Sequence, residues 1–478
     1  MLDCEELGHE PETAPQGDSR GRVVAAVALL LIAALGAAFT VAFNSTVGRN
    51  EMRDYQARMD FFQGRVVMGF SYYLDAMQGA PGPRSQAASD FAHLGALSAA
   101  SYFQKAARGF KDPGERTAAA ASAAALYTHA GENLRALRAL QATMDSGRRD
   151  VLSLLARLYA NQRPTPEWLR SDAFAWIPRH APAHLLVESQ VAQALGRTQR
   201  VAELRRRMHD AGAVVAGRAA VLMFGVGALA LLGVVLLALG GLRRSGFGPY
   251  RGLPQHPWGL WAGLELVGAW LVLYGALSIF GAAAIIWGTA GFAAGILAAY
   301  GLASVIVLVW FAASVAPKGT GLRTAGWTRL PPRQVILNGI GAYAAAVPVA
   351  VLAALLAQRF LPTPPPNPLV AEMTRAHGWA ARALLVVLLC VAAPVVEETV
   401  FRGGLYGGLR KRWSLPVAAL VAAAIFAAVH LNLASLVPVM ALGISLCVVY
   451  ERTGSLLPGM LAHGLFNLVS VIAIFAFS

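Results

Sequence analysis

Charged residues are scarce in this chain. Only 14% of its 478 residues are Asp, Glu, Lys or Arg, whereas 56% are hydrophobic. Long apolar runs separated by short basic clusters are typical of proteins that cross a membrane several times. We therefore expect an all-α polytopic membrane protein.

Cysteine and lysine are also rare. The three cysteines, Cys4, Cys390 and Cys447, are too few and too apolar in setting for a disulfide framework or a zinc ribbon. Only four of the 40 basic residues are lysines, and alanine is abundant, which is typical of a GC-rich bacterial genome. We expect the protein in the inner membrane of a bacterial cell.

The formal net charge of +14 could suggest a nucleic-acid ligand. However, the basic clusters, such as Arg243-Arg244 and Arg410-Lys411-Arg412, lie directly beside apolar runs. Positive charge in this position sets membrane topology. The expected partner is therefore the lipid bilayer, and we expect no nucleic-acid binding.

Nine apolar runs are long enough, or nearly so, to cross hydrocarbon. The first, residues 23–43, lacks a convincing cleavage site, so we expect a retained anchor after a cytoplasmic tail at residues 1–22. Basic clusters recur at alternate loops, which predicts a cytoplasmic N-terminus and an external C-terminus. The later runs are roughly 213–241, 258–284, 289–314, 335–357, 379–403, 415–432, 435–450 and 456–476.

Residues 44–212 are richer in charge, and their apolar residues recur at helical spacing. This pattern predicts a soluble, all-helical extracytoplasmic domain. Three stretches that begin near Thr117, Asp150 and Ala181 are spaced like tetratricopeptide-type helical hairpins, although the diagnostic pattern is incomplete. Two interpretations stay open, a domain that binds a protein partner and a plain helical spacer.

Two adjacent glutamates, Glu397 and Glu398, interrupt an apolar segment near the C-terminus. Ionisable groups at membrane depth are costly, so such a pair points to function. Glu398 and Arg402 are four residues apart on one helix face and can neutralise each other. Glu397 is then the candidate general base, because a carboxylate in a dry pocket can be tuned to accept a proton from water.

Polar pairs spaced four apart also interrupt the next apolar segments, Phe426 with His430 and His463 with Asn467. His430 can orient or activate the same water as Glu397, and His463 and Asn467 can donate hydrogen bonds to an oxyanion. At 1.5 Å of rise per residue, Glu397, His430 and Asn467 lie about 20, 24 and 18 Å from the expected cytoplasmic ends of their helices. The groups can therefore meet at one level.

Together and in this order, the three motifs resemble the CAAX-protease and bacteriocin-processing (CPBP) family, the type II CAAX prenyl endopeptidases. The resemblance covers about residues 250–478. It implies an intramembrane endopeptidase that acts on a membrane-embedded or lipid-anchored protein or peptide. By this resemblance the water is activated by Glu397 and His430, the oxyanion is supported by His463 and Asn467, and the site is completed by Glu398, Arg402 and Phe426.

Several alternatives stay open. We favour a site without cofactor or metal, but a divalent ion such as zinc on Glu397, His430 and His463 is an alternative. The chain lacks the His-Glu-x-x-His, Gly-x-Ser-Gly and Gly-x-Gly-Asp motifs of other intramembrane proteases. A non-catalytic scaffold or immunity protein that acts through residues 44–212 is the second function, and a proton-coupled transporter is the third. Glu265, a further buried acid, is interpreted as a structural carboxyl.

Overall fold

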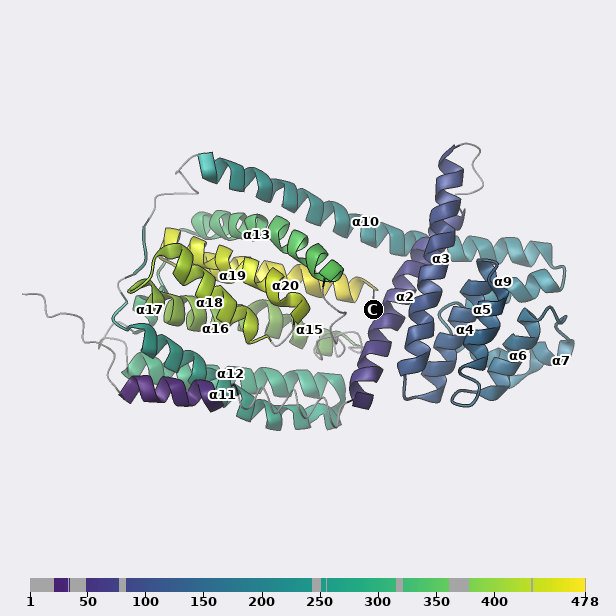
Figure 1. Cartoon of the computed structure of the whole chain (residues 1–478), viewed down its shortest axis with the longest axis horizontal. Coiled ribbons are helices and arrows are strands. Elements are labelled where there is room, and N and C mark those ends of the chain that lie inside the picture. Colours follow the sequence, from purple (N-terminus) through teal and green to yellow (C-terminus); the bar gives the residue numbers. More distant parts are fainter. Residues whose placement is uncertain are drawn as a thin grey trace, which may run out of the picture. The chain divides into compact units, whose positions relative to one another are not determined.

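The computed structural model describes residues 21–32, 34, 49–76, 83–242, 251–254, 256–314, 321–360, 378–430 and 433–477. Every regular element in these residues is helical, and no strand occurs among them. The expected all-α polytopic fold is confirmed. The described helices form two compact units, here called the helical unit and the membrane unit (Figure 1).

The helical unit contains eight helices and the first part of a ninth. The start of α4 shows how the sequence sets a helix boundary: the Asp112 side chain accepts the Glu115 N–H at 2.8 Å, and Pro113 occupies the first turn, where no N–H is needed. The elements are α2 (Arg49–Ala76), α3 (Pro83–Gly109), α4 (Pro113–His129), α5 (Asn133–Gln141), α6 (Arg149–Tyr159), α7 (Pro166–Arg170), α8 (Asp172–His180), α9 (His184–Ala194) and α10 (Thr198–Leu242).

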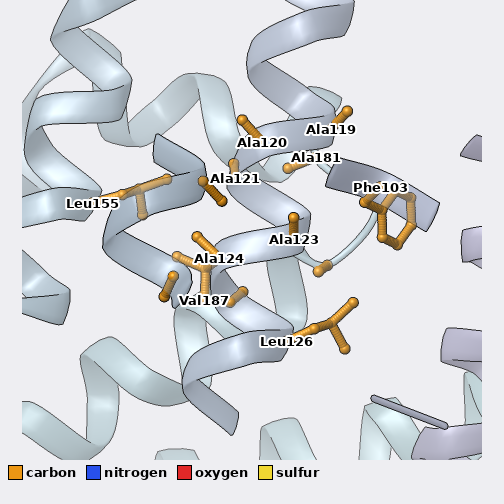
Figure 2. Packing of buried hydrophobic residues seen from close by; sticks show 14 of the residues in the cluster. Phe103, Ala119, Ala120, Ala121, Ala123, Ala124, Leu126, Leu155, Ala181 and Val187 are labelled. Carbon is orange, nitrogen blue, oxygen red and sulfur yellow. The ribbon is translucent and has the colours of Figure 1, made fainter. Parts of the chain in front are cut away.

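Helix α4 forms the centre of the helical unit. Its alanine-rich stretch, 118–125, is buried on all sides, and Figure 2 shows these alanines packed among Phe103, Leu155 and Val187. Small side chains allow neighbouring helices to approach from every direction, so a run of low complexity becomes a close-packed core. Helices α4, α6 and α9 begin within four residues of the three expected hairpin starts. The tetratricopeptide assignment stays a prediction.

The membrane unit contains the rest of α10 and the C-terminal helices. A short apolar helix, Gly21–Ile32, also belongs to it. The elements are α11 (Leu260–Ala282), η2 (Ala283–Trp287), α12 (Gly288–Ser314), η3 (Gly321–Ala325), α13 (Pro332–Phe360), α15 (Trp379–Val387), η4 (Leu388–Ala392), α16 (Ala393–Glu397), η5 (Glu398–Tyr406), α17 (Gly407–Arg410), α18 (Leu415–Ala428), α19 (Leu433–Thr453) and α20 (Leu457–Phe477).

Seven helices of the described chain are long and apolar enough to cross a membrane, judged by length and composition. The other two expected spans correspond to shorter apolar helices, Gly21–Ile32 and Leu415–Ala428. Residues 1–20 of the expected tail and residues 33 and 35–43 of the expected anchor lie outside the described residues. The expected boundary at residue 212 falls inside α10, which continues without interruption from Thr198 to Leu242.

The packing of the membrane unit brings the C-terminal helices around the segment that carries the two glutamates. Helix α19 packs against α13 and α18, while α11 packs against α12 and η5. Buried aromatic and aliphatic side chains of α11, α12, η5, α18 and α19 form one continuous core. Four helices, α11, α12, α18 and α19, are thereby fixed relative to the segment that carries Glu397 and Glu398.

Candidate active site

The helix that carries the glutamates, Trp379–Arg410, is interrupted by two π-helical segments, η4 and η5. In η4 the Ala393 N–H bonds to the Leu388 carbonyl, five residues back. The next residue, Pro394, has no N–H to offer to the Leu389 carbonyl. The side chain of Asn467 supplies the missing donor, with its Nδ2 2.7 Å from the Leu389 oxygen. Asn467 therefore ties α20 to the segment just before Glu397.

Glu398 lies at the centre of a buried ionic cluster. Its Oε1 accepts hydrogen bonds from Arg402 Nη1 and His463 Nδ1, both at 3.0 Å. The side chains of Glu398 and Arg402 are each only 1% exposed, so the pairing is what makes these charges tolerable in the core. Arg402 Nη2 also donates to the Gly443 carbonyl at 3.3 Å. The expected pairing of Glu398 with Arg402 is present.

Glu397 points to different partners. Its Oε1 accepts the Tyr300 hydroxyl at 3.2 Å, while its Oε2 is buried without a hydrogen-bond partner in the described part of the chain. Oε2 lies 3.8 Å from His463 Nε2. Because Nδ1 of this ring donates to Glu398, a neutral His463 would turn the Nε2 lone pair toward a carboxylate oxygen. When either Glu397 or His463 carries a proton, that proton can lie in a hydrogen bond between Oε2 and Nε2. The two side chains can therefore exchange a proton.

Phe426 connects the remaining motif residues. Its ring lies 4.2 Å from the Arg402 guanidinium carbon, in a cation–π arrangement, and it meets the rings of His463 and His430 edge to face, with centroids 5.7 and 4.9 Å away. The Phe426 carbonyl lies 2.7 Å from His430 Nδ1. Since a carbonyl can only accept, Nδ1 carries the hydrogen in a neutral His430, and Nε2 is left with a basic lone pair.

The structure therefore brings the motif residues together, through contacts that cross three helical segments. His463, rather than His430, is the imidazole that touches Glu397 and Glu398, while His430 joins the cluster through Phe426. The roles of base, shuttle and oxyanion donor stay predictions. The residues concerned are Glu397, Glu398, Arg402, Phe426, His430, His463 and Asn467.

Tyr300 was not found from the sequence. It lies on α12, outside the motifs, and 97 residues separate it from the carboxylate that it contacts. The available signal was a single hydroxyl-bearing ring in a stretch of small residues, Ala298-Ala299-Tyr300-Gly301. Glu265, by contrast, forms an ion pair with Arg22 at 3.1 Å, in agreement with a structural carboxyl.

Among the described residues, no group of three or more His, Cys, Asp or Glu side chains is arranged to hold a metal ion. The alternative zinc set of Glu397, His430 and His463 is therefore not assembled as a ligand group. Glu397 and His463 do approach each other, and Glu398 and Phe426 hold the Nδ1 atoms of His463 and His430, which leaves both Nε2 atoms without a hydrogen bond among the described residues. Metal dependence stays a prediction.

Fold and site together define a polytopic α-helical membrane protein with a buried carboxylate–imidazole cluster. Residues 379–469 match the family model described as Type II CAAX prenyl endopeptidase Rce1-like. The matched segment contains all three motifs, so the family resemblance expected from the sequence is confirmed. At the level of the family, the match supports an intramembrane protease.

A similar relative comes from Bacillus subtilis (strain 168) and is named "Putative membrane peptidase YdiL". It is 29% identical over 89 residues, which are 19% of this chain and 36% of the Bacillus protein. The chain thus spans about a third of the length of the curated relative that it matches. No solved structure matches the chain. The family match, over residues 379–469, lies outside the helical unit.

Proposed function

We propose that this protein is an intramembrane endopeptidase that hydrolyses a peptide bond in a membrane-embedded or lipid-anchored protein or peptide. One observation carries the proposal. The buried Glu397 Oε2 has no hydrogen-bond partner in the described chain and lies beside His463, inside the segment that matches the endopeptidase family. A buried carboxylate oxygen next to an imidazole is a suitable base for water.

In the proposed reaction, Glu397 takes a proton from water while the water oxygen attacks the peptide carbonyl carbon. His430 assists as a second acceptor through Nε2, because its Nδ1 is held by the Phe426 carbonyl. The tetrahedral intermediate then collapses, the carbon–nitrogen bond breaks, and the proton held by Glu397 passes to the leaving amine. The second proton of the water leaves the new carboxyl group for the amine, so the products are a carboxylate and an ammonium group. No step requires a metal or another cofactor.

Two side chains are proposed to stabilise the oxyanion. Glu397, Glu398 and Arg402 together carry one net negative charge, which a protonated His463 neutralises. The Nε2–H of that imidazolium is then available as a donor. Asn467 has a second Nδ2 hydrogen besides the one directed at Leu389, and this hydrogen is the other candidate donor. Both donors come from α20, one helical turn apart.

The proposed setting is the inner membrane of a bacterial cell, with the N-terminus in the cytoplasm. A protein partner at residues 44–212 belongs to the proposal as a means of presenting substrate. The motifs themselves do not identify the substrate. The decisive experiment must therefore survey all membrane proteins for cleavage and not test one chosen substrate.

The experiment is quantitative proteomics of protein termini in membranes from cells with the wild-type chain, the Glu397→Gln variant or no chain, at equal expression. The matched control is Glu265→Gln, which also neutralises a buried glutamate on a membrane helix, but in an ion pair with Arg22. We expect new termini with the wild type and with Glu265→Gln, and a loss of about 100-fold or more with Glu397→Gln, as for removal of a general base.

Equal amounts of the same cleaved termini from the wild type and Glu397→Gln would overturn the proposal. The alternative, a scaffold or immunity protein, would then be tested by deletion of partner contacts in the helical unit. Transport that collapses with the proton gradient would instead indicate a proton-coupled transporter.

A further inference from the structure

The helical unit contains a pocket of about 390 Å³ that the proposed reaction does not use. It lies between α2, the connection from α8 to α9, and the part of α10 around Gly212. Two arginines, Arg65 and Arg179, and two histidines, His180 and His184, line it together with apolar side chains. None of the lining residues is acidic. The pocket therefore offers positive charge without a carboxylate to balance it.

Neither arginine is used in an ion pair with any described carboxylate. The contrast with Arg58, two turns earlier on α2, is direct, because Arg58 pairs with both Asp54 and Glu115 at 3.0 and 2.7 Å. A single arginine without an ion pair is usually a surface side chain that water solvates. Two arginines that line the same acid-free pocket instead provide the type of side chain that binds phosphate through paired N–H donors.

The walls of the pocket are held in place by contacts of their own. His180 and His184 use Nδ1 on main-chain carbonyls, at 2.9 and 3.1 Å, and the His180 ring stacks on Trp176 at 4.4 Å between centroids. The floor is a close crossing of α2 and α10, where a Cβ on Gly212 would lie 2.6 Å from the Gly69 oxygen. The pocket is thus preorganised, which lowers the cost of binding.

The position of the pocket on α10 indicates the source of the ligand. Ala211, Gly212 and Val215 line the pocket, and the apolar run of α10 begins at Ala213. Beyond this point the helix exposes large apolar side chains, with Val221 and Phe224 73% and 80% exposed. Exposed apolar residues on a membrane-crossing helix face acyl chains. The pocket therefore lies beside the start of the apolar run of α10, where we expect the helix to enter lipid.

We propose that this pocket binds the phosphate of an anionic membrane lipid, with Arg65 and Arg179 on the headgroup and the acyl chains along the apolar surface of α10. A basic residue near a membrane surface contributes roughly 1 kcal/mol to binding an anionic lipid, or about fivefold in affinity. This inference is independent of the peptidase proposal, since it involves neither the glutamates nor the histidines of the membrane unit.

The test is native mass spectrometry of the full-length chain in detergent, titrated with dioleoyl phosphatidylglycerol. We expect an affinity about fivefold lower for Arg65→Gln or Arg179→Gln and about 25-fold lower for the double variant. The double variant with lysines, Arg65→Lys and Arg179→Lys, should recover most of the affinity because it keeps the charge. Hydrogen exchange in residues 178–185 should slow when this lipid is added to the wild type.

The matched control is the double variant Arg157→Gln and Arg163→Gln, which removes two exposed arginines of the same unit that do not line the pocket. It should bind the lipid like the wild type. Equal affinity of the Arg65 and Arg179 double variant and this control would overturn the proposal. So would equal binding of zwitterionic phosphatidylcholine, and slower exchange caused by inorganic phosphate in place of the lipid would assign the pocket to a free anion.

Discussion

At the scale of single residues, the candidate site depends on how each buried charge is shared. Glu398 accepts two hydrogen bonds from cationic or imidazole donors, whereas Glu397 receives one, from Tyr300. The two adjacent carboxylates thus have different surroundings: both hydrogen bonds to Glu398 end on its Oε1, whereas the buried Oε2 of Glu397 lies beside His463 without a hydrogen-bond partner in the described chain. Different environments of this kind are how two like groups take different chemical roles.

Tyr300 is predicted to act as a positioning residue for Glu397. Tyr300→Phe removes the hydroxyl that lies 3.2 Å from Glu397 Oε1 and leaves the ring packing in place. A hydrogen bond to a charged group is worth roughly 1.5–3 kcal/mol, so the yield of cleaved termini should fall about 10- to 100-fold. The measurement is the same proteomic comparison of membranes.

Tyr274→Phe is the matched control, because Tyr274 packs edge to face on Tyr300, with centroids 5.1 Å apart. It should keep near wild-type cleavage. Equal losses in the two variants would mean that the aromatic cluster, and not the hydrogen bond to Glu397, supports activity.

Asp60 in the helical unit provides a prediction about pH. Burial raises the pKa of Asp60 above its usual 3.8, against a smaller lowering effect of the Gln56 hydrogen bond and of Lys105. The folded state therefore binds the proton more tightly than the unfolded state, and stability falls as the pH rises through the raised pKa. Asp60→Asn cannot ionise, so it should stabilise the unit at pH 7, with no gain below about pH 3.8.

Hydrogen exchange of α2 and α3 in the full-length chain measures this effect, as the difference between variant and wild type at each pH. Asp54→Asn is the control, and it should lower the stability of the unit at pH 7 because Asp54 is paired with Arg58 at 3.0 Å. It should speed exchange at pH 7. Slower exchange in both variants would contradict the assignment of the Asp60 effect to burial.

At the scale of elements, the π-helical segment η4 requires support from α20. Gly464 permits the contact, because a Cβ there would lie 2.7 Å from the Cys390 oxygen, a main-chain atom with little freedom to move. One turn further along, Asn467 satisfies the carbonyl that Pro394 leaves without a donor. The two positions together hold the segment that leads into Glu397.

Gly464→Ala should therefore separate α20 from η4, although it changes no polar side chain. We expect a loss of about 1–3 kcal/mol of stability from overpacking, and a large loss of cleaved termini. Thermal unfolding in detergent and the proteomic comparison measure the two effects. Gly275→Ala, at a site with nothing within 4 Å, should leave both unchanged. Wild-type cleavage by Gly464→Ala would show that this contact is dispensable.

At the scale of the whole molecule, the distribution of basic residues predicts one orientation, with the helical unit outside the cytoplasm and the loop at Arg410–Arg412 inside. In a chain that carries Cys4→Ser, Arg157→Cys should react with a membrane-impermeant maleimide in intact spheroplasts. Arg412→Cys should react only after permeabilisation. Both side chains are exposed, so accessibility does not confound the comparison. The reverse labelling pattern would invert the topology.

The sequence was sufficient for contacts within one helix. The pairing of Glu398 with Arg402 follows from their separation of four residues, and the structure contains it. It was not sufficient for contacts between helices. His430 was expected to act on the same water as Glu397, which stays a prediction, and the sequence did not indicate that His463 is the imidazole within 3.8 Å of Glu397. The role of Asn467 at η4 was equally out of reach, because it depends on a π-helical register that spacing alone does not indicate.

By itself, the sequence determined that this is a polytopic helical membrane protein, which residues carry its three motifs, and which family they match. These properties depend on composition and on the 3.6-residue helical repeat, which can both be read from neighbouring residues in the sequence. Only the tertiary structure decided that Tyr300 joins the site, that His463 lies between the two glutamates, and that two arginines share an acid-free pocket. Such contacts depend on the rotation and depth of each helix, which are set by the packing of all its neighbours together.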